Sequence, residues 1–370
     1  MRVLITGGHF SPAYSLIKEL RSRGHDVIVA GRKYPFEGDK SESFEYRVSK
    51  DENLEFYEVK TGRFQRKFSA YTITSLLKTP LGFFSSFKIL SKSRPNIVLT
   101  FGGYVALPIA LAAYVFRIPV ILHEQTQKGG IASKIISKFA KVVCISFKSS
   151  TDFFPKSNVA FTGNPIRKEI FESHKKILIP EGLAIYITGG STGSHFINSV
   201  VYEILPQLLA DYVVIHQTGE SLRFRDYEKL VSRLKALPKD LQKKYILKKF
   251  IYPDEIGDVF KNSDLIISRS GANIVFEIMA TSKMSLLIPL PYGQNEEQLT
   301  NAKFLKSLGA SEFVEEKDAK ADKILNLINR MFKNKSKYQS NIKSAKEFVV
   351  IDAAKKIADI IEKNYAKKSN

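Results

Sequence analysis

The stretch that decides the fold runs from Leu183 to His195 and reads LAIYITGGSTGSH. Its first part, residues 183–188, is an apolar and β-branched run that is typical of a buried strand. Three glycines then permit a tight turn, and a helical pattern begins near His195. A strand, a glycine turn and a helix in this order bring free N–H groups and the positive end of the helix to one point, which suits a phosphate.

A similar arrangement opens the chain, where the apolar residues 2–6 lead into Gly7, Gly8 and His9. Short β-branched runs alternate with helical patterns along the sequence, a rhythm typical of parallel sheets covered by helices on both faces. The expected strands are Val3–Thr6, Asp26–Ala30, Ile97–Thr100, Val120–His123, Lys141–Ile145, Leu183–Thr188, Tyr212–Gln217, Ile246–Phe250, Leu265–Ser268 and Ser285–Pro289.

Residues 163–183 interrupt this rhythm with prolines, glycines and many charges, which is the composition of a linker. The chain of 370 residues is also too long for one ordinary domain. We therefore predict the α/β class, with two Rossmann-like doubly wound parallel-sheet domains that face a cleft. The expected domains span residues 1–163 and 164–345, and an amphipathic helix within about 346–370 is expected to pack back on the first domain.

The charge balance is strongly basic, with 57 Lys and Arg against 37 Asp and Glu and a formal net charge of +20. Such a cation attracts nucleic acid, an anionic membrane surface or phosphorylated substrates, although scattered lysines on solvated faces explain it equally well. The single cysteine, Cys144, lies in an apolar run and excludes an internal disulfide. The six histidines show no metal-ligand spacing, so we expect neither a metal ion nor a cofactor.

Residues 189–193 also match Gly-x-Ser-x-Gly, the nucleophile turn of α/β hydrolases. That mechanism needs an acid and then a distant histidine after the serine. Only His195 and His216 follow Ser191, the first beside it and the second within an expected strand. The loop at Gly7 lacks the G-x-G-x-x-G pattern of dinucleotide-binding folds. A hydrolase and a dehydrogenase are therefore disfavoured, and a phosphate-binding turn is the better interpretation.

Polar side chains follow other expected strands, at the sheet edge where doubly wound folds bind ligands. His9 comes after the first strand, where it can take a proton from a hydroxyl or donate to a phosphate. Polar residues also end the strand at 120–123 and open the helical patterns near 269–272 and 294–298. A carboxylate or amide at a helix start is often only a cap, but it can also hold a ribose diol.

Six short motifs then occur in a fixed order. They are Gly-Gly-His…Pro-Ala from residue 7, His-Glu-Gln from 123, Gly-Asn-Pro-Ile-Arg from 163, Gly-Gly-Ser-x-Gly from 189, Arg-Ser-Gly-Ala…Glu from 269 and Gln…Asn-Ala from 298. Each motif is weak alone, but together they span residues 1 to about 345. With them the chain resembles the MurG family of N-acetylglucosaminyltransferases of peptidoglycan synthesis. The resemblance implies an inverting, metal-independent transferase with the two-domain GT-B architecture.

The resemblance implies that the second domain binds UDP-N-acetylglucosamine. Ser191 would contact the diphosphate, Glu277 the ribose hydroxyls and Gln298 the sugar, while Phe250 and Ile251 would meet uracil. The full set of implied donor-binding residues is Arg167, Gly189, Gly190, Ser191, Gly193, Phe250, Ile251, Ala272, Asn273, Glu277 and Gln298.

The first domain would bind the acceptor, a muramyl-pentapeptide on undecaprenyl diphosphate, so that lipid I becomes lipid II. The implied acceptor-side residues are Gly7, Gly8, His9, His123, Glu124, Gln125 and Thr126, with His9 as candidate base or diphosphate contact. The chain departs from the family pattern in three places: one glycine pair of the opening loop is missing, Thr126 replaces an asparagine, and Glu297 and Gln298 stand where a pair of glutamines is common. A related transferase with another UDP-sugar or another lipid or glycan acceptor is the alternative.

Residues 73–90 mix apolar side chains with lysines, a pattern that can dip into the face of an anionic membrane, although a helix packed on the sheet fits equally well. A lipid-linked acceptor favours a peripheral protein at the cytoplasmic face of the cell membrane. Nucleic acid is not an expected partner, because neither interleaved aromatics nor an RNP segment is present. The residues expected to meet the membrane are Leu76, Leu77, Leu81, Phe83, Phe84, Phe87, Lys78 and Lys88.

Overall fold

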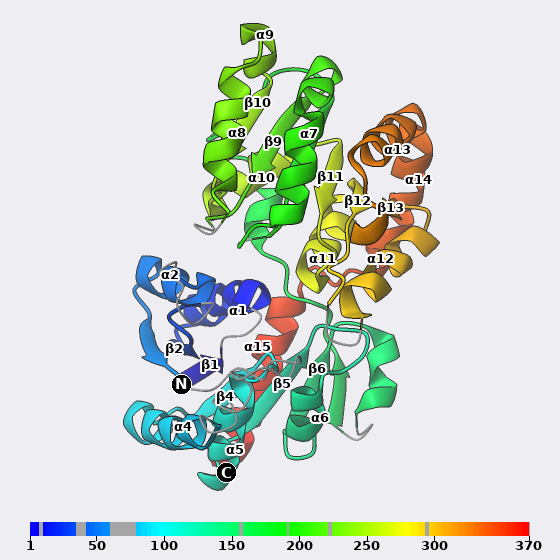
Figure 1. Ribbon diagram of the computed structural model, residues 1–370. Coiled ribbons are helices and arrows are strands. Elements are labelled where there is room, and N and C mark those ends of the chain that lie inside the picture. The colour runs from blue at the N-terminus through cyan, green and yellow to red at the C-terminus, as the bar shows by residue number, and fades with distance from the viewer. Residues whose placement is uncertain are drawn as a thin grey trace. The chain divides into compact units, whose positions relative to one another are not determined.

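The chain forms two compact units. Unit 1 comprises Met1–Arg167 and Val350–Asn370, and unit 2 comprises Lys168–Val349. The computed structural model describes residues 1–6, 10–34, 42–59, 79–154, 158–190, 192–220, 224–292 and 296–369, with the backbone alone at residues 11, 79–81 and 367–369. Each unit contains its own parallel sheet, so the predicted pair of α/β domains is confirmed (Figure 1).

Unit 1 has a seven-stranded sheet with the order β3-β2-β1-β4-β5-β6-β7, in which neighbouring strands are parallel. The chain builds outward from β1 to β3 and then returns to the other side of β1 with β4. The order reverses there, which makes the β1–β4 junction the switch point of the sheet. The strands are β1 (Arg2–Thr6), β2 (Asp26–Gly31), β3 (Glu55–Glu58), β4 (Ile97–Thr100), β5 (Val120–Glu124), β6 (Val142–Ile145) and β7 (Val159–Phe161).

The central strands of unit 1 are buried on both faces, which explains their unbroken apolar sequences. In β1, Val3 and Ile5 lie in a core with Leu16 of α1, whereas Leu4 lies in a second core with Ile109 of α5. The sheet is therefore covered on both sides. The helices before the second unit are α1 (Phe10–Ser22), α2 (Phe44–Asp51), α4 (Thr79–Ser93), α5 (Ala106–Val115), α6 (Ile131–Ser137) and the short 3-10 helix η1 (Lys148–Phe153).

The last helix, α15 (Ala353–Ser369), packs on α1 within unit 1 (Figure 1). Ile357 and Ile361 lie in the same core as the apolar face of α1. Arg23, which follows α1, pairs with Asp359 at 2.7 Å and with Glu362 at 2.9 Å. The C-terminal segment thus completes the apolar cover of the first sheet.

Unit 2 has a six-stranded parallel sheet with the order β10-β9-β8-β11-β12-β13, and its order reverses between β8 and β11. Its strands are β8 (Ala184–Thr188), β9 (Val213–Gln217), β10 (Tyr245–Lys248), β11 (Leu265–Ser268), β12 (Met284–Leu287) and β13 (Ser311–Phe313). Its α-helices are α7 (His195–Asp211), α8 (Asp226–Lys235), α9 (Lys239–Gln242), α10 (Pro253–Asn262), α11 (Ala272–Thr281), α12 (Glu297–Ser307), α13 (Ala321–Lys333) and α14 (Lys335–Ser344). Three short 3-10 helices complete it: η3 (Lys168–Phe171), η5 (Glu316–Asp318) and η6 (Ala345–Phe348).

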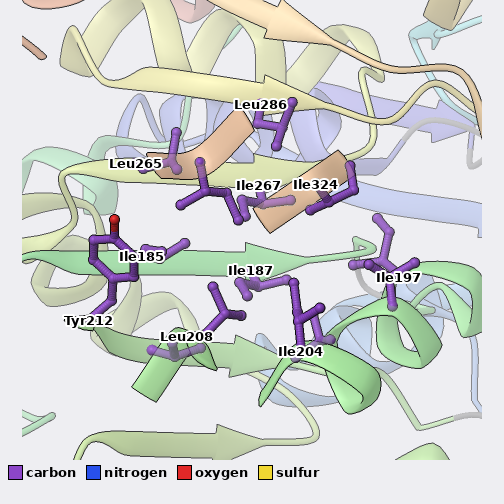
Figure 2. Packing of buried hydrophobic residues seen from close by; sticks show 14 of the residues in the cluster. Ile185, Ile187, Ile197, Ile204, Leu208, Tyr212, Leu265, Ile267, Leu286 and Ile324 are labelled. Carbon is purple, nitrogen blue, oxygen red and sulfur yellow. The ribbon is translucent and has the colours of Figure 1, made fainter. Parts of the chain in front are cut away.

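One apolar core of unit 2 lies between its central strands and helices α7 and α13. Ile187 of β8 and Ile267 of β11 are almost completely buried there, against Ile204 of α7 and Ile324 of α13 (Figure 2). This packing anchors β8 and α7 on either side of the glycine turn. A turn that is fixed at both ends can present its backbone to a ligand in one conformation.

The predicted linker, residues 163–183, is not a free connection. Asp258 of α10 accepts hydrogen bonds from the Ser173 hydroxyl at 2.6 Å and from the Lys176 N–H at 2.6 Å. A Cβ added at Gly257 would lie 1.5 Å from a carbonyl oxygen of this segment, so the two backbones are in direct contact. The charged residues in 163–183 suggested a linker, but the part of this segment around Ser173 and Lys176 is bound to α10.

Candidate functional site

The glycine loop after β8 has the geometry that the sequence predicts. Ser194 caps α7, and its hydroxyl accepts the Ile197 N–H at 3.3 Å. Gly190 and Gly193 have φ angles of +87° and +76°, in the left-handed region that favours glycine. A Cβ added at Gly190 would meet no heavy atom of the described residues within 4 Å. None of the residues that the structure describes therefore covers Gly190 on this side of the loop.

The other two glycines of the loop are enclosed by protein. A Cβ added at Gly193 would lie 2.0 Å from the carbonyl oxygen of Thr218, in the loop after β9. A Cβ added at Gly189 would lie 2.2 Å from the backbone nitrogen of the helix cap. Packing thus demands glycine at 189 and 193, whereas position 190 has room. Ser191 lies outside the described residues, so its contact with a diphosphate stays a prediction.

Gln217, the last residue of β9, links the glycine loop to a second predicted donor segment. Its Nε2 donates to the Gly190 carbonyl oxygen at 2.9 Å, and its Oε1 accepts the Ile251 N–H at 3.1 Å. Ile251 is buried, and the neighbouring Phe250 ring packs edge-on against Tyr252. Gln217 is not among the residues predicted from the sequence, although a polar residue at the end of a buried strand points to other residues of the site.

Arg269, directly after β11, ties three loops of unit 2 together. Its Nη2 donates to Ser194 Oγ at 2.7 Å, its Nη1 donates to the Ile288 carbonyl oxygen at 3.0 Å, and it forms an ion pair with Glu316. A guanidinium has several donors in one plane, so a single side chain can serve all three partners. Arg269 therefore fixes the start of the helix that follows the glycine loop.

The predicted residues after β11 lie at the start of α11. Ala272 is the first residue of the helix and Asn273 the second. A Cβ added at Gly271, the residue before them, would meet no heavy atom of the described residues within 4 Å. The first turn of α11 can thus be approached from this side. Glu277 lies further along the helix and is only 4% exposed.

Gln298, in the first turn of α12, joins two loops at this edge of the sheet. Its Oε1 accepts the N–H groups of Ser270 at 3.3 Å and of Leu290 at 3.0 Å. The Ser270 hydroxyl in turn donates to the Gln298 carbonyl oxygen at 2.7 Å. Because the side-chain oxygen is engaged, the amide nitrogen is the group that can reach a sugar hydroxyl.

A buried hydrogen-bonded network around His216 of β9 supports the glycine loop. Asn198 Nδ2 donates to the carbonyl oxygen of Thr218 at 3.0 Å and to Asp226 at 2.9 Å, so its Oδ1 accepts from His216 Nε2 at 3.1 Å. His216 Nδ1 then accepts the Tyr245 hydroxyl at 2.7 Å. Burial lowers the pKa of His216 to about 3, which keeps the ring neutral. Neither nitrogen can serve a serine nucleophile, which further disfavours a hydrolase.

The predicted acceptor-side residues at the end of β5 are buried and connected. Glu124 Oε1 accepts the Thr126 N–H at 2.9 Å and the Thr126 hydroxyl at 2.7 Å, so this carboxylate shapes the turn. His123 Nε2 lies 3.2 Å from the Gly163 carbonyl oxygen, and Gln125 is 2% exposed. The structure thus places these four predicted residues together, with Glu124 engaged in bonds inside the protein.

Three predicted acceptor-side residues, Gly7, Gly8 and His9, follow β1 and lie outside the described residues, so their roles stay predictions. Arg167 is half-buried at the end of the first segment of unit 1. Within the described ranges, no group of three or more His, Cys, Asp or Glu side chains is placed to hold a metal ion.

The predicted membrane-facing segment is partly described. Phe84 of α4 is 73% exposed, Lys88 is exposed and Phe83 is partly so. The Phe87 ring contacts Phe116 at a centroid distance of 5.5 Å. Three further exposed residues at the end of α5 are not among those predicted to meet the membrane: Tyr114, Val115 and Phe116. Leu76, Leu77 and Lys78 lie outside the described residues, as does the side chain of Leu81. Of the helices that the structure describes, none is both long and apolar enough to cross a membrane.

Known proteins share this arrangement. Residues 6–145 match the glycosyltransferase family 28 N-terminal domain, and residues 184–362 match the glycosyltransferase family 28 C-terminal domain. The two parallel sheets are those of a two-domain glycosyltransferase of the GT-B type.

Individual relatives narrow the class. The UDP-N-acetylglucosamine--N-acetylmuramyl-(pentapeptide) pyrophosphoryl-undecaprenol N-acetylglucosamine transferase of Clostridium tetani (strain Massachusetts / E88) is 31% identical, over 100% of this chain and 99% of its own. The protein of the same name from Clostridium novyi (strain NT) is 30% identical over 98% of each chain. The crystal structure of Acinetobacter baumannii MurG is 25% identical, with a TM-score of 0.67 over 98% of this chain and 99% of its own. The chain belongs to this family of N-acetylglucosamine transferases, which confirms the resemblance and the architecture it implied.

Proposed function

We propose that this chain transfers N-acetylglucosamine from UDP-N-acetylglucosamine to the muramyl-pentapeptide of an acceptor on undecaprenyl diphosphate. The reaction inverts the configuration at the transferred sugar and converts lipid I to lipid II. The observation that carries the proposal is the glycine loop of unit 2, whose backbone is open at Gly190 in front of the capped start of α7. The chain's relatives, which match it from end to end, carry this activity in their names.

The donor diphosphate would lie at residues 189–193. Free N–H groups and the positive end of α7 face a phosphate there, and Ser191 adds a hydroxyl donor. Negative charge builds on the β-phosphate as the bond to the sugar breaks. Fixed donors stabilise that charge without reorganising, and the loss of one such donor typically lowers a rate by ~10²–10³-fold. Arg167 would complete the donor site.

The rest of the donor would follow the sheet edge of unit 2. Uracil would meet the backbone of Ile251 beside Phe250, the ribose hydroxyls would bind Glu277, and the sugar would bind the amide nitrogen of Gln298. Gln217 bonds both the glycine loop and Ile251, so it keeps the diphosphate and uracil positions at a constant spacing.

The acceptor hydroxyl would attack the anomeric carbon from the face opposite UDP, and its proton would pass to a base. We assign His9 this role, or that of a donor to the acceptor diphosphate, since it follows β1 at the switch point of unit 1. The turn that Glu124 organises at the end of β5 would form a neighbouring wall of the acceptor site.

A lipid-linked acceptor also requires a membrane surface, which we place at the cytoplasmic face of the cell membrane. Exposed apolar side chains lie on α4, at Phe84, and at the end of α5, at Tyr114, Val115 and Phe116. Lys88 lies on α4 and is exposed. Aromatic side chains flanked by lysines bind the interface of an anionic bilayer through both burial and charge.

A transfer assay tests the activity. Purified full-length protein should move radiolabel from UDP-N-acetylglucosamine to a lipid I analogue. Glu277→Gln and His9→Ala should each lower the rate at least about 100-fold with an unchanged melting temperature. Glu203→Gln, the same change at an exposed position of α7, is the matched control and should leave the rate unaltered.

A thermal-shift series with several UDP-sugars tests the donor separately. UDP-N-acetylglucosamine should raise the melting temperature most. A larger rise with another UDP-sugar would favour the related-transferase alternative, and no rise with any nucleotide would exclude the transferase function.

Flotation with phosphatidylglycerol vesicles tests the membrane surface. Phe84→Ser should lower the bound fraction several-fold, whereas Leu178→Ser, at an exposed apolar residue of unit 2, should not. Equal loss with both variants, or none with either, would remove this surface from the proposal.

A further inference from the structure

Arg32 lies at the switch point of the first sheet, and the mechanism above does not use it. It directly follows β2, and its Nη1 donates to the Tyr104 hydroxyl at 3.0 Å. Tyr104 comes shortly after β4. β2 and β4 flank β1 in the sheet (Figure 1). The bond between a residue after β2 and a residue after β4 therefore crosses the carboxyl end of β1. The two side chains together bridge two strand spacings, roughly 10 Å, beside the point where the strand order reverses.

The protein holds Arg32 at its backbone and at its tip. The Arg32 N–H donates to the half-buried Glu45 carboxylate at 3.4 Å, and the Arg32 carbonyl oxygen accepts the Ser43 hydroxyl. The guanidinium carbon lies 6.0 Å from the centre of the Tyr104 ring. In the described part of the chain, the hydrogen-bond partner of this guanidinium is a neutral hydroxyl. Most of its N–H donors are therefore not used by the described residues and can serve a ligand, while its positive charge also acts on the nearby Glu45 carboxylate.

The surroundings of Arg32 favour an anion as the ligand. Lys33 is the next residue and brings a second cation, which lies over the Tyr34 and Tyr46 rings. Gly103, beside Tyr104, has φ of +83°, and an added Cβ would meet no heavy atom of the described residues within 4 Å. The sheet edge thus combines two positive charges with accessible backbone.

We propose that Arg32, positioned by Tyr104, binds the diphosphate of the lipid-linked acceptor. The inference rests on the proposed function, which supplies an acceptor with that group. A guanidinium binds phosphate oxygens through two parallel N–H donors, and Lys33 can meet a further oxygen as a point charge. Arg32 holds substrate in this role, and Tyr104 acts through Arg32.

Kinetics with a soluble lipid I analogue test the assignment. Arg32→Gln should raise the KM for the acceptor roughly 10–100-fold, while the KM for UDP-N-acetylglucosamine and the thermal shift with UDP stay unchanged. Arg32→Lys should restore part of the affinity. Tyr104→Phe, which keeps the charge but loses the hydroxyl, should have a smaller effect in the same direction. Arg94→Gln, an exposed site before β4 at the opposite edge of the sheet, is the control for net charge.

A second acceptor analogue, with an uncharged linker in place of the diphosphate, identifies the group that is bound. Arg32→Gln should hardly change the KM for this analogue. An equal rise with both analogues would assign Arg32 to another part of the acceptor and overturn the proposal. A lower melting temperature or kcat with an unchanged acceptor KM would do so too, because Arg32 would then only hold its loop.

Direct binding separates this proposal from the proposed function. Calorimetry with a short-chain prenyl diphosphate needs no transfer reaction, and Arg32→Gln should weaken its binding about 10-fold or more. Wild-type protein that binds the prenyl diphosphate but no UDP-sugar would overturn the transferase function alone. Wild type and Arg32→Gln with equal affinity for the prenyl diphosphate would overturn the role of Arg32 alone.

Discussion

The Gln217 side-chain amide donates to the carbonyl oxygen of Gly190 at 2.9 Å and holds the glycine loop against the end of β9. The same amide accepts the Ile251 N–H, so one side chain joins the loops that follow three neighbouring strands. A carboxylate could not donate to Gly190, and an aliphatic side chain could do neither. Glutamine is therefore matched to this position by both of its polar atoms.

Gln217→Leu should weaken UDP binding roughly 10–30-fold, because the loop loses two fixing hydrogen bonds that are together worth roughly 2 kcal/mol. Isothermal titration with UDP measures the effect. Gln242→Leu is the matched control, since Gln242 bonds only a local carbonyl oxygen near α9. Unchanged UDP affinity in Gln217→Leu would show that the loop keeps its conformation without this link.

The glycines of the loop should respond differently to alanine. Gly193→Ala forces a Cβ to within 2.0 Å of a carbonyl oxygen, so the loop must move, and UDP binding should fall more than about 10-fold. Gly190→Ala meets no such obstacle and should cost only the ~1–2 kcal/mol of a left-handed alanine. Calorimetry with UDP and thermal unfolding of both variants measure the contrast. Equal losses in the two would contradict the packing argument.

The central strands could be predicted from sequence because burial on both faces gives them unbroken apolar runs, as in β8 and β11. The strands β3, β7 and β13 were missed. Each lies at an edge of its sheet and is only partly buried, so it lacks such a run. The helix predicted to start within 294–298 begins at Glu297. Sequence alone could not give this boundary, because the polar residues there fit either a helix or the loop before it.

The positions of Gly189, Ala272 and Gln298 at a strand end or a helix start could be predicted from the sequence, while their roles stay predictions. The bond between Arg32 and Tyr104 could not, because it joins residues 72 positions apart and depends on strand order. Sequence shows which residues end a strand, but only the sheet shows that β2 and β4 lie on either side of β1. The support that Arg269 gives to Ser194 was missed for the same reason.

His216 should make the stability of unit 2 depend on pH. Burial lowers its folded-state pKa from 6.5 to about 3. As the pH falls below 6.5, the unfolded chain takes up a proton that the folded chain excludes. The stability from neutral His216 is thus complete above the unfolded pKa and is lost as the pH falls towards the folded pKa, by about 1.4 kcal/mol per pH unit.

Urea unfolding at pH 7, 6 and 5 tests this dependence. His216→Gln should be less stable than wild type at pH 7, and the difference should shrink at each lower pH. His174→Gln, at an exposed histidine of the same unit, should follow the wild-type slope. A stability difference that stays constant from pH 7 to 5 would mean that His216 titrates in the folded protein as it does in the unfolded chain, so that burial does not lower its pKa.

Asp258→Asn should release the segment at residues 173–177 from α10. Burial acts to raise the pKa of Asp258, but hydrogen bonds from Ser173 and three backbone N–H groups outweigh it and hold that pKa below the ordinary 3.8. The carboxylate therefore stabilises the fold fully above pH 3.8, and this contribution is lost as the pH falls through the lowered pKa. At pH 7 the asparagine amide would turn an NH₂ group towards N–H donors and cost roughly 2 kcal/mol.

Two measurements at pH 7 check this expectation. Denaturant unfolding should show the loss of stability, and trypsin should cleave faster at Lys175 and Lys176, whose N–H groups Asp258 binds. Asp254→Asn, an exposed carboxylate in the first turn of α10, should change neither result beyond a few tenths of a kcal/mol. If Asp258→Asn unfolds like wild type yet is cleaved faster, the bonds fix the segment without stabilising the unit. If neither quantity changes, the segment is held by backbone contact at Gly257 alone.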